Sequence, residues 1–189
     1  MEGRPGPGKR QAAVDRTRTL VLEAARDLVA SPEGAGLSLG AVARRAGVSR
    51  LTIYNQFGSR EGLLRAVAGE AHRRTPEPVP APAPADAREE LRRRITAACV
   101  RWASNPALFR GLSPVATSSH DRRGDEDRRL AERLASADLL RPGCSLKEAE
   151  DVIGALTSFA MFDRLHGDGR RSASAVAEIL MRLAAAILS

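Results

Sequence analysis

The 189-residue sequence contains few aromatic residues, with four phenylalanines, one tyrosine and one tryptophan. Aromatic and β-branched residues, which favour strands, are sparse, whereas alanine, leucine and arginine dominate. There is no hydrophobic run long enough to cross a membrane. The N-terminal sequence MEGRPGPGKRQ also lacks the apolar stretch of a signal peptide. We therefore expect an all-α protein that is cytoplasmic and has no membrane partner.

Cysteine is scarce as well. Cys99 and Cys144 lie far apart and form no CxxC or CxxH pattern, so we expect both to be reduced, small apolar residues. The three histidines are scattered without the spacing of a zinc site, which predicts no bound metal. Glycine-rich phosphate motifs are missing, and the adjacent residues 118–121 cannot assemble a catalytic triad, whose members come from distant positions. The sequence predicts neither an enzyme nor a cofactor.

The segment SLGAVARRAGVSRLTIYNQFGSREGLL, residues 38–64, is the most informative part of the chain. Ser38, Ser49 and Ser59 can each cap a helix, because a serine hydroxyl accepts hydrogen bonds from first-turn N–H groups. Gly47 can end the first of these helices in the left-handed conformation. Two short helices joined by a glycine-containing turn are typical of a helix-turn-helix, whose second helix lies in the DNA major groove.

The polar positions of the second helix suit DNA. Arginine can bind phosphate or guanine, hydroxyls can bind phosphate, and amides match adenine edges. The alternative is an ordinary helical hairpin whose polar side is only solvated. The side chains of the second helix that we predict to face DNA are Arg50, Leu51, Thr52, Tyr54, Asn55 and Gln56.

The stretch AGVSRLTIYNQFGSREGLL resembles the signature of TetR-type transcriptional regulators, and the upstream segment TRTLVLEAARDLV supports the resemblance. The likeness covers residues 16–68. It implies a homodimer that binds a palindromic operator in double-stranded DNA and encloses a small-molecule effector among the middle helices of a second domain. It also implies that Tyr54 packs on the DNA backbone or a base and that Arg60 reaches a phosphate. Ser38 and Ser49 complete the predicted DNA-binding set.

Positive charge is concentrated in the first part of the chain. The first 75 residues hold 13 Arg and Lys against 7 Asp and Glu, whereas the rest hold 17 against 16. A basic half favours a polyanion such as DNA. We predict four parts: a disordered basic tail (1–12), a helix-turn-helix domain (13–75), a proline-rich linker (76–85) and a helical regulatory and dimerisation domain (86–189).

Helical periodicity and capping signals predict the individual elements. In the first domain we expect helices over 16–30, 39–46, 50–57 and 60–74. In the second we expect a loop over 113–125. A single helix over 146–166 follows the S-x-x-E capping box at Ser145, and a last helix ends near Leu188.

Two apolar sets in the second domain have candidate roles. By the resemblance, an apolar ligand pocket is expected among Trp102, Phe109, Leu112, Leu134, Leu156, Phe159 and Phe162, although any helical core needs such residues. The 4-3-4 spacing of the other set is that of a coiled-coil seam, which predicts a dimer interface; the alternative is that it completes the monomer core. This seam consists of Val176, Leu180, Leu183 and Ile187.

These features together predict a dimeric, sequence-specific DNA-binding regulator, a repressor that a small apolar ligand releases from its operator. An effector-independent, nucleoid-type DNA-binding protein is one alternative. A helical enzyme or adaptor that merely carries a helix-turn-helix is another.

Overall fold

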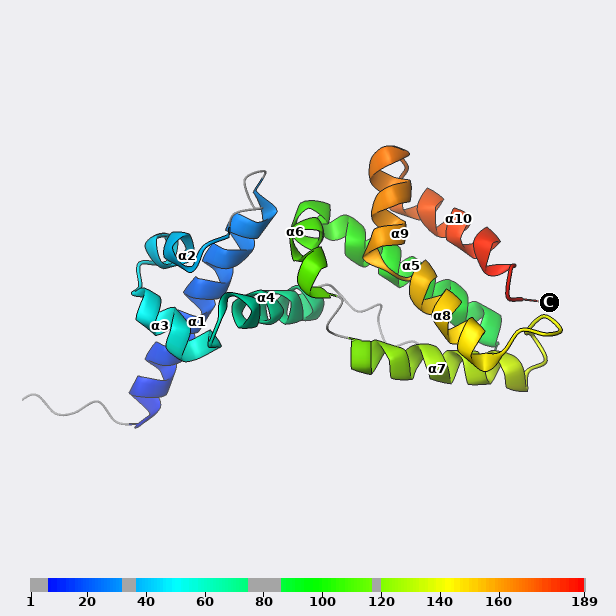
Figure 1. Cartoon of the computed structure of the whole chain (residues 1–189), viewed down its shortest axis with the longest axis horizontal. Helices are drawn as coiled ribbons and strands as arrows, with labels where there is room; N and C mark the ends of the chain where they lie inside the picture. Colours follow the sequence, from blue (N-terminus) through cyan, green and yellow to red (C-terminus); the bar gives the residue numbers. More distant parts are fainter. Residues whose placement is uncertain (1–6, 32–36, 75–85, 117–119, 189) are drawn as a thin grey trace, which may run out of the picture.

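The computed structural model describes residues 7–31, 37–74, 86–116 and 120–188, and its regular elements are helices (Figure 1). The expected all-α class is confirmed. None of the helices in these ranges is long and apolar enough to cross a bilayer. The predicted linker over 76–85 lies outside the described residues.

The first part of the chain contains four helices: α1 (Pro7–Ala30), α2 (Leu39–Ala46), α3 (Arg50–Phe57) and α4 (Arg60–Arg74). Helix α1 packs against both α2 and α4, while α3 bridges α2 and α4. Their shared core is fully buried, and its central members are Val21, Ala25, Val42, Ile53 and Leu63. Burial of these side chains supplies the main stabilisation of a unit whose helices α2 and α3 are too short to form alone.

Helix α1 is longer than predicted. The disordered tail expected over 1–12 is wrong for residues 7–12, because α1 already begins at Pro7. Proline is tolerated in the first turn of a helix, where no intrahelical N–H bond is lost. One turn on, the Gln11 side chain donates to the Asp15 carboxylate at 2.9 Å, which supports the extended helix. Residues 1–6 lie outside the described residues.

The second part is arranged around one central helix, α5 (Ala87–Ser104), which the Asp86 side chain caps. Helix α5 packs against four others, namely α6 (Pro106–Ala116), α7 (His120–Ser136), α9 (Phe159–Asp163) and α10 (Ala173–Ala184). Helix α8 (Leu146–Leu156) lies on α7, and a π-helical turn, Arg164–Asp168, follows α9.

Two expectations about this part are wrong. No loop spans 113–125, because α6 continues to Ala116 and α7 begins at His120. The charged composition of that segment does not indicate a loop, since arginine is a good helix former. The last helix ends at Ala184 rather than near Leu188. Beyond it the Arg141 N–H donates to the Ile187 carbonyl at 3.0 Å, which attaches the end of the chain to the turn before α8.

The helix expected over 146–166 is interrupted at Thr157 and Ser158, which separate α8 from α9. The Ser158 hydroxyl accepts from the Met161 N–H and so caps a new helix. The Trp102 indole N–H, from α5, donates to the Thr157 carbonyl at 3.0 Å. A polar contact from a distant helix therefore stabilises the break.

Helix α6 connects the two parts of the molecule, since it packs on α1 and α4 as well as on α5 and α9 (Figure 1). Gly111 approaches α1 so closely that a Cβ atom there would lie 2.6 Å from Val29 Cγ1 and 2.7 Å from the Val29 carbonyl oxygen. The adjacent Arg110 forms a two-pronged ion pair with Asp163 of α9, at 3.1 Å and 2.5 Å. Helix α6 is thus in close contact with α1 on one side and joined by an ion pair to α9 on the other.

The role of Trp102 at the helix break can be tested with Trp102→Phe. The substitution keeps an aromatic ring but removes the N–H that Thr157 accepts, so we expect the free energy of unfolding to fall by about 1–3 kcal/mol. Because Trp102 is the sole tryptophan, urea unfolding should be followed by circular dichroism. A loss below about 0.5 kcal/mol would show that this hydrogen bond does not stabilise the break.

Candidate nucleic-acid interface

The turn between α2 and α3 is built by the caps that the sequence predicts. The Ser38 hydroxyl accepts from the Ala41 N–H at 3.1 Å, and the Ser49 hydroxyl accepts from the Thr52 N–H at 3.0 Å. Gly47 ends α2 with φ of 67°, a left-handed conformation that costs glycine little. These contacts fix the direction in which α3 leaves the turn.

Helix α3 has one buried side and one exposed side. Ile53 is fully buried. The guanidinium carbon of Arg18, from α1, lies over the Phe57 ring at 4.7 Å from the ring centroid. On the other side, Leu51 is 66% exposed and Tyr54 is 60% exposed. Because these two residues are three positions apart on the helix, they are neighbours, and a contiguous exposed apolar patch, unlike a single exposed residue, marks a contact surface.

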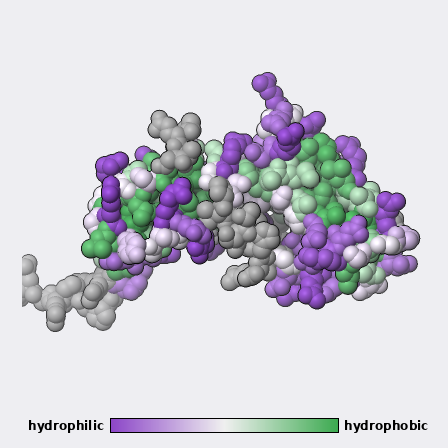
Figure 2. Space-filling view, viewed as in Figure 1, coloured by the Kyte–Doolittle hydropathy of each residue, from purple (hydrophilic) through white to green (hydrophobic). Residues whose placement is uncertain are grey.

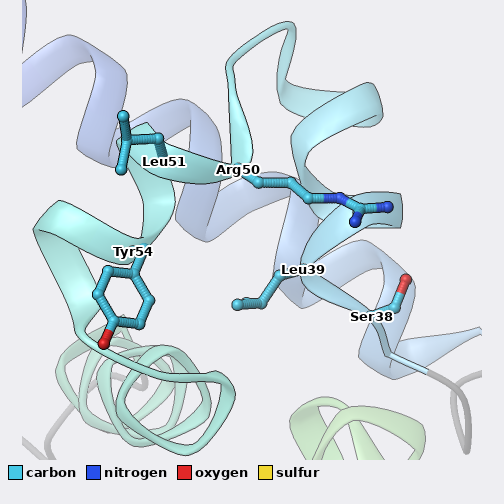
Figure 3. Close-up of a pocket in the computed structure, with 6 residues that line it drawn as sticks. Ser38, Leu39, Arg50, Leu51 and Tyr54 are labelled. Carbon is cyan, nitrogen blue, oxygen red and sulfur yellow. The ribbon is translucent and has the colours of Figure 1, made fainter.

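A groove of about 500 Å³ opens between the start of α2 and the outer side of α3 (Figure 3). Its walls are Ser38, Leu39, Gly40, Arg50, Leu51 and Tyr54. Leu51 and Tyr54 line it from α3, while the Arg50 side chain extends from the first turn of α3 across to α2. The groove therefore brings together four of the residues predicted to bind DNA.

The charge of this surface has one sign. Residues 38–60 contain four arginines and no aspartate or glutamate. Of these arginines, Arg45 pairs with Asp27 of α1 at 2.8 Å. A segment that combines a groove, an exposed arginine and no acidic residue of its own suits a phosphate backbone.

Several predicted DNA-binding residues also have structural contacts. Ser38 and Ser49 cap α2 and α3, and the Ser49 hydroxyl also forms a hydrogen bond with the Thr52 hydroxyl at 2.8 Å. Arg60 Nε donates to the Leu37 carbonyl at 2.8 Å and so holds the start of α2 against α4. The amide oxygen of Gln56 is buried, not presented to solvent.

Two residues of the groove, Leu39 and Gly40, were not predicted. Their position directly after the Ser38 cap was the available signal, since the first turn of α2 must lie beside α3 in a helix-turn-helix. On α3 the exposed residues of the predicted set are Arg50, Leu51, Tyr54 and Asn55, and Ser38, Ser49 and Arg60 are exposed outside it.

Known proteins share this helix-turn-helix. Residues 21–67 match the tetR family of bacterial regulatory proteins. The N-terminal part of the chain therefore carries a TetR-type DNA-binding domain. The HTH-type transcriptional regulator AlkX of Mycobacterium tuberculosis is 46% identical to it over 66 residues, which are 33% of this chain and 31% of that protein. The chain thus matches less than a third of the length of that curated relative.

Solved structures resemble the chain over most of its length. A TetR-like transcriptional regulator from Rhodococcus sp. RHA1 is 25% identical, with a TM-score of 0.62, over 89% of this chain and 93% of that one. NalD of Pseudomonas aeruginosa, described as the secondary repressor of the MexAB-OprM multidrug efflux pump, is 18% identical, with a TM-score of 0.65, over 92% and 98%. At that identity NalD shows the fold alone. The resemblance drawn from the sequence is confirmed.

The residues predicted to line a ligand pocket are packed in the core of the second part. All seven are less than 10% exposed. Trp102 lies edge to face with Phe109 and Phe159, at centroid distances of 4.8 Å and 5.6 Å. Three of the seven predicted residues are thus aromatic rings in contact with one another.

The prediction that the apolar seam of the last helix forms a dimer interface is wrong for three of its four residues. Val176, Leu180 and Ile187 are at most 1% exposed within the single chain, because this face of α10 packs on α5 and α8. Only Leu183, which is 46% exposed, faces outward.

A neighbouring stripe of α10 and the turn after it remains accessible. We call it the α10 stripe, and its members are Ala175, Ile179, Leu183 and Ala186. Figure 2 shows hydrophobic surface over α9 and α10.

Two buried ionisable groups of the second part have raised pKa values. Burial raises the pKa of the Asp127 carboxyl, an effect that Arg94, 2.5 Å away, partly offsets. Burial also raises the pKa of the Cys99 thiol to about 11, which keeps it protonated at neutral pH. Among the residues that the structure describes, no three His, Cys, Asp or Glu side chains are placed to hold a metal ion.

Tyr54→Ala and Arg60→Ala separate DNA contact from structural support. Because Tyr54 is exposed, its loss should weaken DNA binding by roughly 1–2 kcal/mol without lowering the free energy of unfolding. Arg60→Ala should weaken binding and also destabilise the fold by about 1 kcal/mol, since Leu37 loses a donor.

The measurements are fluorescence anisotropy with duplex DNA and urea unfolding. Arg65→Ala is the matched control, because Arg65 pairs with Glu61 on the surface of α4, away from the groove. Wild-type affinity in both Tyr54→Ala and Arg60→Ala would remove these residues from the interface.

Proposed function

We propose that the chain is a dimeric transcriptional repressor that binds a palindromic operator with α3 in the major groove. The observation that carries this proposal is the outer side of α3, where Leu51 and Tyr54 are exposed beside Arg50 in an acid-free segment. Base edges in the major groove are read by such a protruding short helix. The similarity to AlkX, an HTH-type transcriptional regulator, supports the same role.

Selection of bound sequences from random duplex DNA tests the proposal. The selected consensus should be an inverted repeat, and affinity should fall steeply as salt rises, because phosphate contacts release counterions. Binding that shows no sequence preference would instead support an effector-independent, nucleoid-type protein. A chain that does not bind DNA at all would contradict both.

Dimerisation is proposed through the α10 stripe. Its apolar members lie beside the buried face of α10, so a second copy can cover them without disturbing the core of either chain. A two-fold axis makes such a contact self-complementary. It would also place the two α3 helices one DNA turn, about 34–36 Å, or a multiple apart.

Leu183→Glu and Leu180→Glu form a matched pair that tests this interface. A carboxylate at exposed Leu183 should leave the chain folded but monomeric, and should abolish specific DNA binding, because it would be buried unpaired in the dimer. The same change at buried Leu180 should unfold the chain. Sedimentation and circular dichroism distinguish the outcomes. A Leu183→Glu dimer as stable as the wild-type dimer would contradict the proposal that the α10 stripe is the dimer interface.

An effector is proposed to act through the aromatic core. An apolar molecule that separates Trp102, Phe109 and Phe159 would displace α6, because Phe109 belongs to that helix. Since α6 packs on α1 and α4, the DNA-binding helices would shift with it. Preferential binding to the shifted state is sufficient to release DNA.

The packed core also favours a second candidate, an effector-independent regulator. Thermal unfolding of the chain with a panel of fatty acids and polycyclic aromatic compounds separates the two. A compound that raises the Tm and releases the selected operator supports an effector. Compounds that bind without changing operator affinity, or no binding at all, favour the effector-independent alternative.

A further inference from the structure

The guanidinium of Arg50 lies against Gly40, the second residue of α2. A Cβ atom built on Gly40 would lie 2.5 Å from Arg50 Nη2, 2.9 Å from Nε and 3.0 Å from Cζ. Side chains do not tolerate such separations, so any residue larger than glycine would displace the guanidinium. Figure 3 shows the Arg50 side chain reaching from α3 to α2 across the upper edge of the groove.

The backbone of α2 gives no other reason for glycine at this position. Gly40 lies inside a regular helix, between the Ser38 cap and the buried Val42, and it does not adopt a positive φ. Glycine is among the least favourable residues in a helix, so its use here calls for a close approach of another group. The group that approaches is Arg50.

Arg50 also points away from the part of α3 that would enter the major groove. Leu51 and Tyr54 line α3 itself, whereas the Arg50 guanidinium ends beside the first turn of α2. In a docked helix-turn-helix the first helix crosses the DNA backbone and the second reads the bases. A cation held beside the first helix therefore lies where phosphates pass. Within the described ranges no acidic side chain pairs with Arg50.

We propose that Gly40 is a positioning residue for DNA binding, which seats Arg50 against α2 so that Arg50 contacts a backbone phosphate and not a base edge. The inference rests on the proposed DNA-binding function and assigns the role of one residue within it. Of the two partners that an arginine on this helix can take, phosphate or guanine, it assigns phosphate to Arg50.

The experiment uses the full chain with Gly40→Ala, Arg50→Ala and the double substitution. Gly69→Ala is the matched control, because a Cβ there meets only the end of Arg73 at an ordinary 3.7 Å. Each protein is titrated with the selected operator and with an unrelated duplex of equal length, at several salt concentrations. Unfolding is measured in parallel, and alanine at position 40 should leave the Tm unchanged or raise it by up to roughly 4 °C.

Arg50→Ala should weaken binding to both duplexes roughly tenfold and reduce the salt slope by about 0.9 for each phosphate that the protein no longer neutralises. Gly40→Ala should weaken both duplexes roughly three- to tenfold, and it should have no further effect when Arg50 is already alanine. The Gly69→Ala control should bind like the wild type.

Three results would overturn the inference while leaving DNA binding intact. The first is a Gly40→Ala protein with wild-type affinity, and the second is Gly40 and Arg50 effects that multiply independently. The third is an Arg50→Ala protein that loses affinity for the selected operator alone while its salt slope stays unchanged. Failure of the wild-type chain to bind either duplex would instead overturn the proposed function, and the role of Arg50 with it.

Discussion

The contact between Gly111 and Val29 is the constraint on which the arrangement of the two parts depends. A Cβ at position 111 would overlap the side chain and the carbonyl oxygen of Val29, so α6 and α1 approach as closely as backbones can. The neighbouring Arg110 is tied to Asp163 of α9. Because packed elements transmit displacement rather than absorb it, a movement of α9 or of the aromatic core reaches α1 through one helix.

The helix-turn-helix could be predicted residue by residue because its determinants are local. Ser38 and Ser49 cap helices whose first turns lie within three residues, and Gly47 needs only its own left-handed conformation. Each signal is therefore complete within a short stretch of sequence. The side of α3 that faces outward also followed from spacing, since Ile53 is the fully buried position of that helix and Leu51 and Tyr54 lie away from it.

The second part could be predicted only in outline, because its details depend on distant partners. The break after α8 needs the Trp102 indole, which lies 55 residues away from the carbonyl it contacts. The spacing of Val176, Leu180 and Ile187 describes an apolar face but does not say whether the cover is α5 of the same chain or a second copy. Likewise, an aromatic cluster has the same sequence pattern whether its rings surround a ligand or one another.

The same division explains how the proposed interface would recognise DNA. The hydroxyls of Ser49 and Thr52 form a hydrogen bond with each other, and Arg60 donates to the Leu37 carbonyl. Several polar side chains of the segment are therefore already used in hydrogen bonds within the protein. The groove-facing surface of α3 is left with Arg50, the apolar side chain of Leu51 and the aromatic ring of Tyr54. Apolar contact discriminates mainly through the thymine methyl, whereas phosphate contacts carry affinity without sequence information. An interface of this kind should therefore owe most of its affinity to its arginines and its sequence preference to a small number of base contacts.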